Sequence, residues 1–183
     1  MRICTTLLFV CGLLGAAVDA RASERYLLQP GDILTVSVWK EADLTGELLV
    51  RPDGGISLPL AGDIDAAGHT TEEVRATIHD RLHELIPAAT VTVAVKATTG
   101  NQIFVIGKVA RPGQYLMNRP LDIMQALSLA GGATPFAAVN DIHVLRREAD
   151  KQQAISFHYT DVESGRHPEQ NIVLKAGDTV VVP

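Results

Sequence analysis

Hydrophobic and polar residues alternate in short runs along most of the chain, and this period of two is typical of half-buried strands. The runs for which we expect strands are 26–29, 33–38, 47–51, 56–60, 89–96, 103–109, 115–117, 142–147, 154–159 and, around a turn, 172–182. Glycine, proline and polar residues separate these runs, and we expect 161–170 to be a polar loop. The pattern predicts an α+β protein that is rich in short strands.

Two segments instead repeat their apolar residues at helical spacing. In the first, Thr70 can cap the N-terminus and Glu73, three residues later, can complete a capping box. Pro87 is expected to end this helix. Its predicted buried face consists of Val74, Ile78, Leu82 and Leu85.

The second helix is expected to begin at Pro120 and to stop at Gly131 and Gly132, because glycine takes the left-handed conformation after a last helical turn without strain. Its predicted apolar positions are Leu121, Met124, Leu127 and Leu129. A hairpin, this helix and returning strands follow one another in that order. The order predicts a β-grasp-like unit over 101–183.

The sequence Leu-x-x-Gly-Asp-x-x-x-Val occurs twice, at 28–36 and at 174–182. Each copy predicts a strand, a tight turn and a second strand. Gly31 and Gly177 allow a positive φ at the turn, and Asp32 and Asp178 can bond the local backbone. Neither copy contains a nucleophile or a cluster of metal ligands, so the repeat indicates construction and assembly rather than catalysis.

Two other glycine turns have their own predicted geometry. Asp53-Gly54 lies between two apolar runs and predicts a β-hairpin that joins 47–51 to 56–60. Pro112-Gly113 is expected to form a type II turn. Both turns lie where strands must reverse direction.

A polar break at 98–101 divides the chain into two predicted domains. The first is a small α+β unit over 23–97, and the second is the β-grasp-like unit over 101–183. A chain of this length is sufficient to bury one core or two small ones.

The first 22 residues have the pattern of a secretory signal peptide. A positive start is followed by a mostly apolar run over 3–17 and by the small-x-small sequence Ala20-Arg21-Ala22. We expect cleavage before Ser23 and a periplasmic location. An uncleaved anchor and a lipoprotein that is modified at Cys11 are the alternatives.

Charge and cysteine content exclude several classes of function. The chain has 16 basic and 21 acidic residues and no basic cluster, so we do not expect nucleic acid as a partner. Both cysteines, Cys4 and Cys11, lie in the predicted signal peptide. The mature protein is therefore expected to lack disulfides, thiol catalysis and cysteine-bound zinc. No motif indicates a cofactor.

The motifs together resemble those of bacterial polysaccharide export proteins of the Wza type, nearly from end to end and in the same order. The first predicted domain resembles the polysaccharide export domain, and the second resembles a soluble-ligand-binding β-grasp (SLBB) domain. The positions that carry the resemblance, and that we expect to be a structural and assembly signature, are Gly31, Asp32, Asp53, Gly54, Pro59, Gly62, Gly107, Pro112, Gly113, Gly131, Gly132, Gly177 and Asp178.

The resemblance implies a non-enzymatic component of exopolysaccharide or capsule export. Identical subunits would form a ring-like conduit or collar that meets an inner-membrane polysaccharide copolymerase and an outer-membrane component, with polysaccharide as cargo. Larger members of the family have further repeats and a C-terminal pore helix. Only five residues follow Gly177-Asp178 here, so we expect this chain to have no transmembrane helix of its own.

Several residues admit a sharper chemical interpretation. His79 and His83 have the i, i+4 spacing of a metal site, although a solvated helix flank is the simpler explanation. Two of the four aspartates that lie beside a glycine could act as an acid–base pair, although capping of the backbone is favoured. These four are Asp32, Asp53, Asp63 and Asp178. Residues 131–135 could form a ligand loop, although a helix stop is favoured.

Other chemical motifs are weaker. Ser57 and Ser128 lack the context of a nucleophile elbow, and Gly107-Lys108 lacks the glycine-rich run of a phosphate loop. Trp39 is expected to be a core residue at a strand end. The scarcity of aromatic residues argues against tight glycan binding.

Two alternatives to the export hypothesis stay open. One is a monomeric periplasmic module that binds a soluble oligosaccharide, and the other is a periplasmic carbohydrate-active enzyme. A ring seen by light scattering or electron microscopy would favour assembly, and hydrolysis of purified polymer would favour the enzyme.

Overall fold

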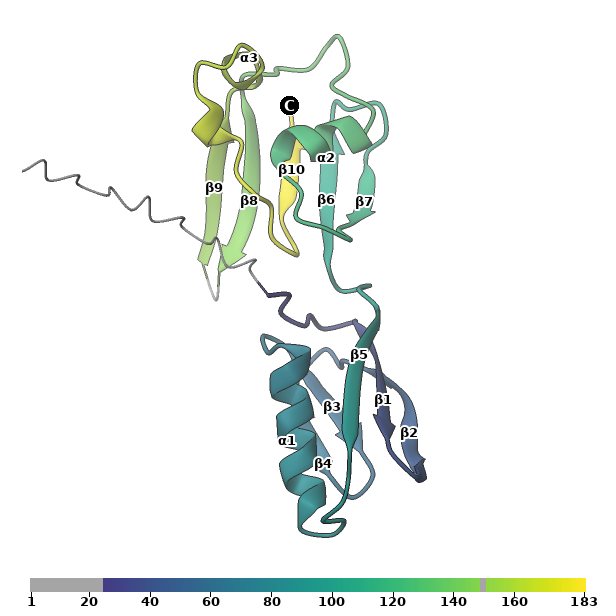
Figure 1. The fold of residues 1–183 in the computed structure, drawn as a ribbon. Helices are drawn as coiled ribbons and strands as arrows, with labels where there is room; N and C mark the ends of the chain where they lie inside the picture. Colours follow the sequence, from purple (N-terminus) through teal and green to yellow (C-terminus); the bar gives the residue numbers. More distant parts are fainter. Residues whose placement is uncertain (1–24, 149–150) are drawn as a thin grey trace, which may run out of the picture.

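The computed structural model describes residues 25–148 and 151–183, and it shows two α+β units that follow each other along the chain (Figure 1). The predicted signal peptide and its cleavage site lie outside the described residues. The α+β fold class predicted from the alternation of polar and apolar residues is confirmed.

The first unit contains two antiparallel sheets and one helix. The larger sheet has the strand order β2-β1-β5, and the smaller one pairs β3 with β4. Its elements are β1 (Ile33–Val38), β2 (Glu41–Leu49), β3 (Gly55–Leu58), β4 (Gly62–Asp65), α1 (Thr71–His83) and β5 (Val91–Ala97).

Helix α1 covers one face of the larger sheet. Thr70 and Glu73 form the predicted capping box, and Val74, Ile78 and Leu82 are buried. Leu85 was expected on the same face and is instead 61% exposed, because the helix ends at His83, before Pro87. Among the described residues, no helix lies over the opposite face of this sheet, and the side chains of β1 and β5 on that face are partly or fully exposed.

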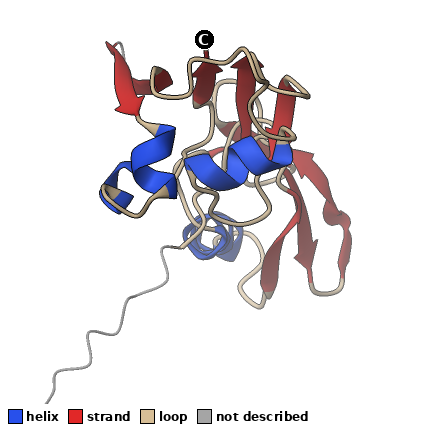
Figure 2. Ribbon diagram, turned by 90° about the horizontal axis from the view of Figure 1, so that it is seen from above, coloured by secondary structure: helices blue, strands red, loops and turns tan. Residues whose placement is uncertain are grey.

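The second unit is one mixed sheet of five strands, in the order β7-β6-β10-β8-β9, with helix α2 packed against it. Viewed from above, the helices lie to one side of these strands (Figure 2). The elements are β6 (Gln102–Gly107), β7 (Gly113–Leu116), α2 (Ile123–Leu129), β8 (Ile142–Glu148), β9 (Lys151–Phe157), α3 (Tyr159–Glu163), the 3₁₀ helix Pro168–Gln170 and β10 (Thr179–Val182).

The last strand, β10, occupies the centre of its sheet. It pairs in parallel with β6 on one side and antiparallel with β8 on the other. Val180 and Val182 of β10 are fully buried beside Ile103, Val105 and Val144. The segment that carries the second Gly-Asp turn therefore closes the second hydrophobic core.

Several predicted elements differ from the structure. The hairpin expected between 47–51 and 56–60 is wrong: β2 pairs with β1, and β3 pairs with β4. The chain does turn at Gly54, with φ of 88°, but the turn passes from one sheet to the other. Residues 26–29 form no strand, and the expected loop 161–170 contains the end of α3 and the 3₁₀ helix.

Two turns of the second unit also differ from expectation. Asp122, not Pro120, caps α2, with Gln125 completing a second capping box. Gly113 has no positive φ and opens strand β7, so the type II turn predicted there is wrong. Gly131 and Gly132 do end α2 with φ of 79° and 83°, which confirms the predicted helix stop.

Among the described residues, no helix combines the length and the apolar character that crossing a membrane would need.

Candidate functional site

The two Gly-Asp turns have the same internal geometry. Gly31 and Gly177 have φ of 95° and 84°, a region that side-chain-bearing residues rarely adopt. The amide of Asp32 donates to the carbonyl of Gln29 at 3.0 Å, and that of Asp178 donates to the carbonyl of Lys175 at 3.1 Å. The sequence repeat is therefore a structural repeat.

Each turn aspartate also accepts a hydrogen bond from the residue three positions earlier. The Gln29 amide reaches Asp32 Oδ2 at 2.9 Å, and the Lys175 amide reaches Asp178 Oδ2 at 2.8 Å. These carboxylates are the only buried polar or charged side chains among the described residues. Burial without partners would cost several kcal/mol, so their remaining partners decide what each turn does.

The first turn holds the linker between the two units. The second oxygen of Asp32, Oδ1, accepts a 3.0 Å hydrogen bond from the amide of Gly100, 68 residues away. The hydroxyl of Thr99 donates to the carbonyl of Gly31. A Cβ on Gly100 would overlap the carbonyl oxygen of Pro30, so only glycine allows this close approach.

Tyr26 supplies the last partner of Asp32. Its hydroxyl donates to Asp32 Oδ2 at 2.5 Å. Burial first, and then the hydrogen bond and the charge of Asp32, raise the pKa of Tyr26 above its ordinary value, so it is a donor at neutral pH. The Asp32 carboxylate thus accepts three hydrogen bonds, two of them from backbone amides.

The second turn holds strand β8. Asp178 receives Arg146 in a fork, with Nη2 to Oδ2 at 2.6 Å and Nε to Oδ1 at 3.0 Å. The side chains of Arg146 and Asp178 are 11% and 1% exposed, so the ion pair is almost completely shielded from solvent. Arg146 also donates to the carbonyl of Val173, which fixes the chain entering the turn. The hydrogen bond to Asp178 is the main cause that raises the pKa of Arg146.

A third cluster, which contains the signature residue Asp53, surrounds Arg51 on the surface of the first unit. Its Nε donates to Asp53 at 3.0 Å, and its Nη1 donates to Ser57 at 2.5 Å and to Asp63 at 2.9 Å. Arg51 lowers the pKa of Asp53; Ser57 first, and Arg51 second, lower that of Asp63. A general acid must hold a proton near neutral pH, so these two carboxylates are unsuited to that role.

The remaining signature positions have turn geometry or lie at strand ends. Gly54, Gly62 and Gly107 have positive φ, and a Cβ on Gly107 would overlap the carbonyl oxygen of Val182. Pro59 is an exposed turn residue, and Pro112 is an exposed residue in the loop before β7. These positions are spread over both units and form no single cavity.

The two predicted metal-site histidines lie on the exposed side of α1. Their rings stack with centroids 5.7 Å apart, and His79 Nδ1 lies 3.2 Å from Asp80. Within residues 25–148 and 151–183, no group of three or more histidine, cysteine or acidic side chains has the arrangement of a metal site.

Ser57, considered as a nucleophile, bonds Arg51 and Asp63. The structure places no histidine or lysine in hydrogen-bond contact with it. Residues 131–135 form a helix stop, as Gly132 N–H donates to the carbonyl of Leu127 at 2.9 Å.

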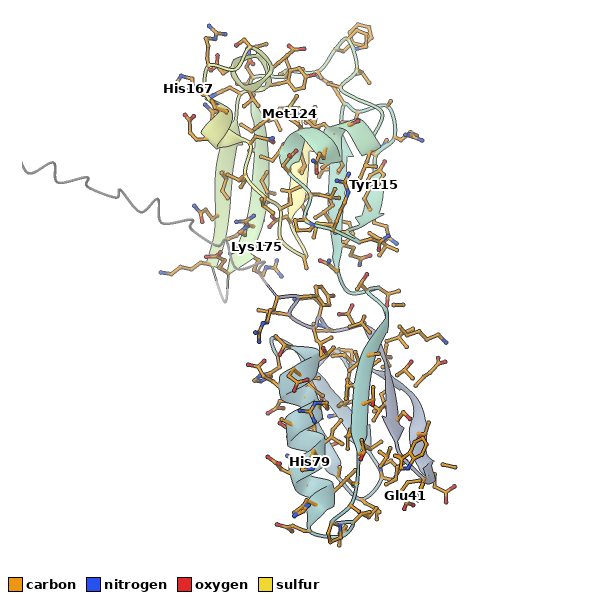
Figure 3. All side chains as sticks on the ribbon, in the orientation of Figure 1. Glu41, His79, Tyr115, Met124, His167 and Lys175 are labelled. Carbon is orange, nitrogen blue, oxygen red and sulfur yellow. The ribbon has the colours of Figure 1, made fainter. Side chains whose placement is uncertain are left out.

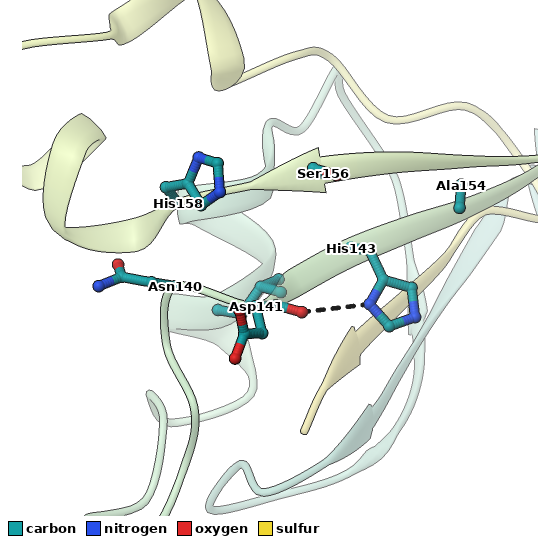
Figure 4. A pocket seen from close by; sticks show the side chains of 7 residues that line it. Asn140, Asp141, His143, Ala154, Ser156 and His158 are labelled. Atoms are coloured by element: carbon teal, nitrogen blue, oxygen red, sulfur yellow. Dashed lines mark hydrogen bonds between the residues drawn. The ribbon is translucent and has the colours of Figure 1, made fainter.

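A shallow hollow lies over the paired strands β8 and β9 at one end of the second sheet. Asn140, Asp141, His143, Ser156 and His158 line it, and the Asp141 carbonyl lies 3.2 Å from His143 Nδ1 (Figure 4). It has no metal cluster of three ligands.

Three of the residues that make these contacts carry little sequence signal. Gly100, Arg51 and Arg146 are ordinary polar-break or strand-flank residues in the printed sequence, and their partners lie up to 68 residues away. Tyr26 could have been found, because it lies two residues before the first copy of the motif and six residues before Asp32. Trp39, expected in the core, is 69% exposed.

Two family models match this chain, one for each unit. Residues 20–96 match the family described as polysaccharide biosynthesis/export protein, and residues 101–182 match the SLBB domain. The chain is a member of the polysaccharide export protein family. The resemblance seen in its motifs is thereby confirmed.

Curated proteins of exopolysaccharide export and production are similar to the chain over most of its length. The EPS I polysaccharide export outer membrane protein EpsA of Ralstonia nicotianae is 31% identical, over 86% of this chain and 47% of its own length. The exopolysaccharide production protein ExoF of Rhizobium meliloti is 30% identical, over 70% of this chain and 33% of its own.

A third relative extends the comparison to capsule. The capsule polysaccharide export protein BexD of Haemophilus influenzae is 24% identical, over 88% of this chain and 45% of its own length. This member of the export family thus spans about half, or less, of the length of the curated relatives it matches.

Proposed function

We propose that this chain is a non-enzymatic assembly component of exopolysaccharide or capsule export, located in the periplasm and peripheral to the outer membrane. Identical subunits pack side by side into a ring-like collar, and polysaccharide passes through its lumen. On the two sides the collar meets an inner-membrane polysaccharide copolymerase and an outer-membrane component. Membership in the family and the names of the relatives support the cargo.

The observation that carries the assembly role is the joint between the two domains, for which we keep the boundaries 23–97 and 101–183. Asp32, at 0% exposure, bonds the Gly100 amide of the linker. A closed ring requires every subunit to present its surfaces at one angle. A linker that is bonded to a buried carboxylate provides this fixed angle better than a free polar linker would.

The non-enzymatic part of the proposal is supported by how the four turn aspartates are used. Asp32 and Asp178 are buried and bonded to structural donors, and Asp53 and Asp63 share Arg51. All four hold the fold together and none is free to serve as an acid–base pair.

The turns offer a direct test in cells. Gly31→Val and Gly177→Val place a β-branched residue at φ of 95° and 84°, so we expect loss of secreted polymer while polymer still accumulates inside the cell. Gly46→Val is the matched control, because Gly46 has no positive φ and no atom lies within 4 Å of its would-be Cβ. Loss of intracellular polymer as well would contradict the export role.

The ring itself is tested with the purified protein. We expect light scattering and negative-stain images to show a closed oligomer of the wild-type chain. A stable monomer at the concentrations used for imaging would contradict the collar.

The hollow over β8 and β9 favours a second candidate, a monomeric module that binds a soluble oligosaccharide. Its lining offers hydroxyl, amide and imidazole groups of the kind that bind sugar hydroxyls. A monomer that binds oligosaccharide, and loses binding with Ser156→Val, would support this candidate over the collar.

A further inference from the structure

Trp39 lies at the two-residue turn between β1 and β2, with 69% of its surface exposed. Its backbone amide donates to the carbonyl of Thr90 at 2.9 Å, and the following Lys40 has φ of 66°. Position 39 therefore contributes to the turn through its backbone amide, which any residue except proline supplies. The indole packs in neither hydrophobic core, so its size has no structural explanation in the described chain.

Two shallow hollows flank this side chain. Ser37, Trp39, Thr90 and Thr92 line one, on the side of β5. The other lies on the side of β2, and Ser37 and Trp39 line it together with Val38, Lys40, Glu41, Ala42 and Thr45. Because both hollows share Trp39, the indole stands between them.

The hollows lie on an open part of the molecule. The turn is at the end of the first unit that points away from the second, where Glu41 is labelled in Figure 3. Residues of β1 with side chains on this face, such as Ser37, are partly exposed, whereas their neighbours Val36 and Val38 are buried beneath the sheet. A long ligand could cross this face without entering a closed cavity.

The chemistry of the two hollows suits a sugar polymer. The apolar C–H face of a pyranose packs on an aromatic ring, and its hydroxyls exchange hydrogen bonds with side chains such as Ser37, Thr90 and Thr92. The hollow on the β2 side contains one cation, Lys40, and one anion, Glu41, so it offers no net charge that would exclude a neutral sugar.

We propose that Trp39 and the hollows on its two sides bind consecutive sugar residues of a polysaccharide chain. This inference rests on the proposed function for the identity of the cargo. One exposed ring and open, polar hollows give weak binding, which suits a polymer that must slide past. The site adds a contact surface for cargo to a protein whose other signature residues maintain its fold.

The chain contains a single tryptophan, so its fluorescence reports on this site alone. We expect maltohexaose, added to the purified full-length protein, to shift the emission to shorter wavelength in a saturable way. Glucose fills one hollow at most, so it should need a concentration at least about tenfold higher for the same shift. Unchanged emission with maltohexaose and with an oligogalacturonate hexamer would overturn the proposal.

Substitutions distinguish a role of the indole side chain from a role of the turn that carries it. We expect Trp39→Ala to abolish retardation of the protein in a polysaccharide-containing native gel, Trp39→Tyr to retain it in part, and Thr92→Val to weaken it. Phe136→Ala is the matched control, because Phe136 is 83% exposed and belongs to the second unit. Equal retardation of Trp39→Ala and wild type would refute the site.

Three further outcomes are distinguishable. An emission shift that follows protein concentration without sugar would make Trp39 a contact between subunits and overturn the glycan site. A deletion strain that secretes polymer normally would remove the proposed function. A strain that needs the protein but is indifferent to Trp39→Ala would remove only this inference.

Discussion

The hydroxyl of Tyr26 donates a 2.5 Å hydrogen bond to the buried carboxylate of Asp32, which also holds the Gly100 amide of the linker. Residues 26–32, at the start of the first unit, are thus bonded to the linker that leads into the second unit. In the second domain, the equivalent turn uses Arg146 in place of the phenol. The same local sequence therefore supports two different tertiary connections.

Alkaline pH should expose the contribution of Tyr26. Its folded pKa lies above the ordinary value of 10.0, so the stability it adds is complete below that value and falls as the pH rises toward the folded pKa. We expect the free energy of unfolding in urea to drop between about pH 10 and pH 12, and to drop less in Tyr26→Phe.

Tyr115→Phe is the control for this experiment, because the Tyr115 hydroxyl donates to the carbonyl of Arg111 and not to a carboxylate. Identical alkaline slopes for wild type and Tyr26→Phe would show that the phenol–carboxylate bond has no part in stability.

Substitution by alanine should change the stability of the protein strongly at one signature glycine and hardly at all at another. The Cβ of Gly107→Ala would overlap the Val182 carbonyl at φ of 95°, so we expect a loss of about 2–3 kcal/mol in the free energy of unfolding. Gly113 has an ordinary φ and open space around its Cα, so Gly113→Ala should change stability by less than about 0.5 kcal/mol. Chemical denaturation measures both, and equal losses would contradict the assigned backbone geometry.

The pair of Arg146 and Asp178 should be costly to break from one side only. Arg146→Met leaves a buried carboxylate without its cation, and we expect a loss of about 3–5 kcal/mol. The double variant Arg146→Met/Asp178→Leu should recover much of this loss, because it removes both buried charges. Lys175→Ala breaks the exposed pair with Glu148 and should cost at most about 1 kcal/mol. A double variant no more stable than Arg146→Met would show that desolvation is not the cause.

The linker should loosen when Gly100 gains a side chain. In Gly100→Ala the new Cβ would overlap the Pro30 carbonyl, so the linker must leave the first turn and lose its bond to Asp32. We expect faster cleavage around 98–101 in limited proteolysis while both domains stay folded by circular dichroism. Gly46→Ala, with open space at its Cα, serves as the comparison, and the same cleavage rate in both variants would rule out the joint.

Local sequence signals predicted the parts of this fold whose partners lie within a few residues. The capping box of Thr70 and Glu73, and the helix stop at Gly131 and Gly132, are confirmed because both depend on one helical turn. The hairpin predicted around Gly54 is wrong because the turn signal says nothing of which strand pairs with which. Pairing followed the buried faces of the strands instead.

The candidate site was less predictable than the fold. The glycines and aspartates of both turns stand out in the sequence. The residues that bond to these aspartates, Gly100 and Arg146, are distant in the chain and are brought to the turns only by the tertiary structure. Trp39 was misplaced because an aromatic residue at a strand end is usually buried, and nothing local shows that the face above it lacks a helix.

The position of β10 has a consequence for how the protein reaches its native state. Thr179–Val182 fill the gap between β6 and β8, yet they are synthesised after the other described strands. Until they arrive, β6 and β8 each present an unpaired backbone edge to their surroundings. The newly made chain therefore passes through an interval in which these edges can pair with other chains, and chaperones would have their clearest opportunity to act then.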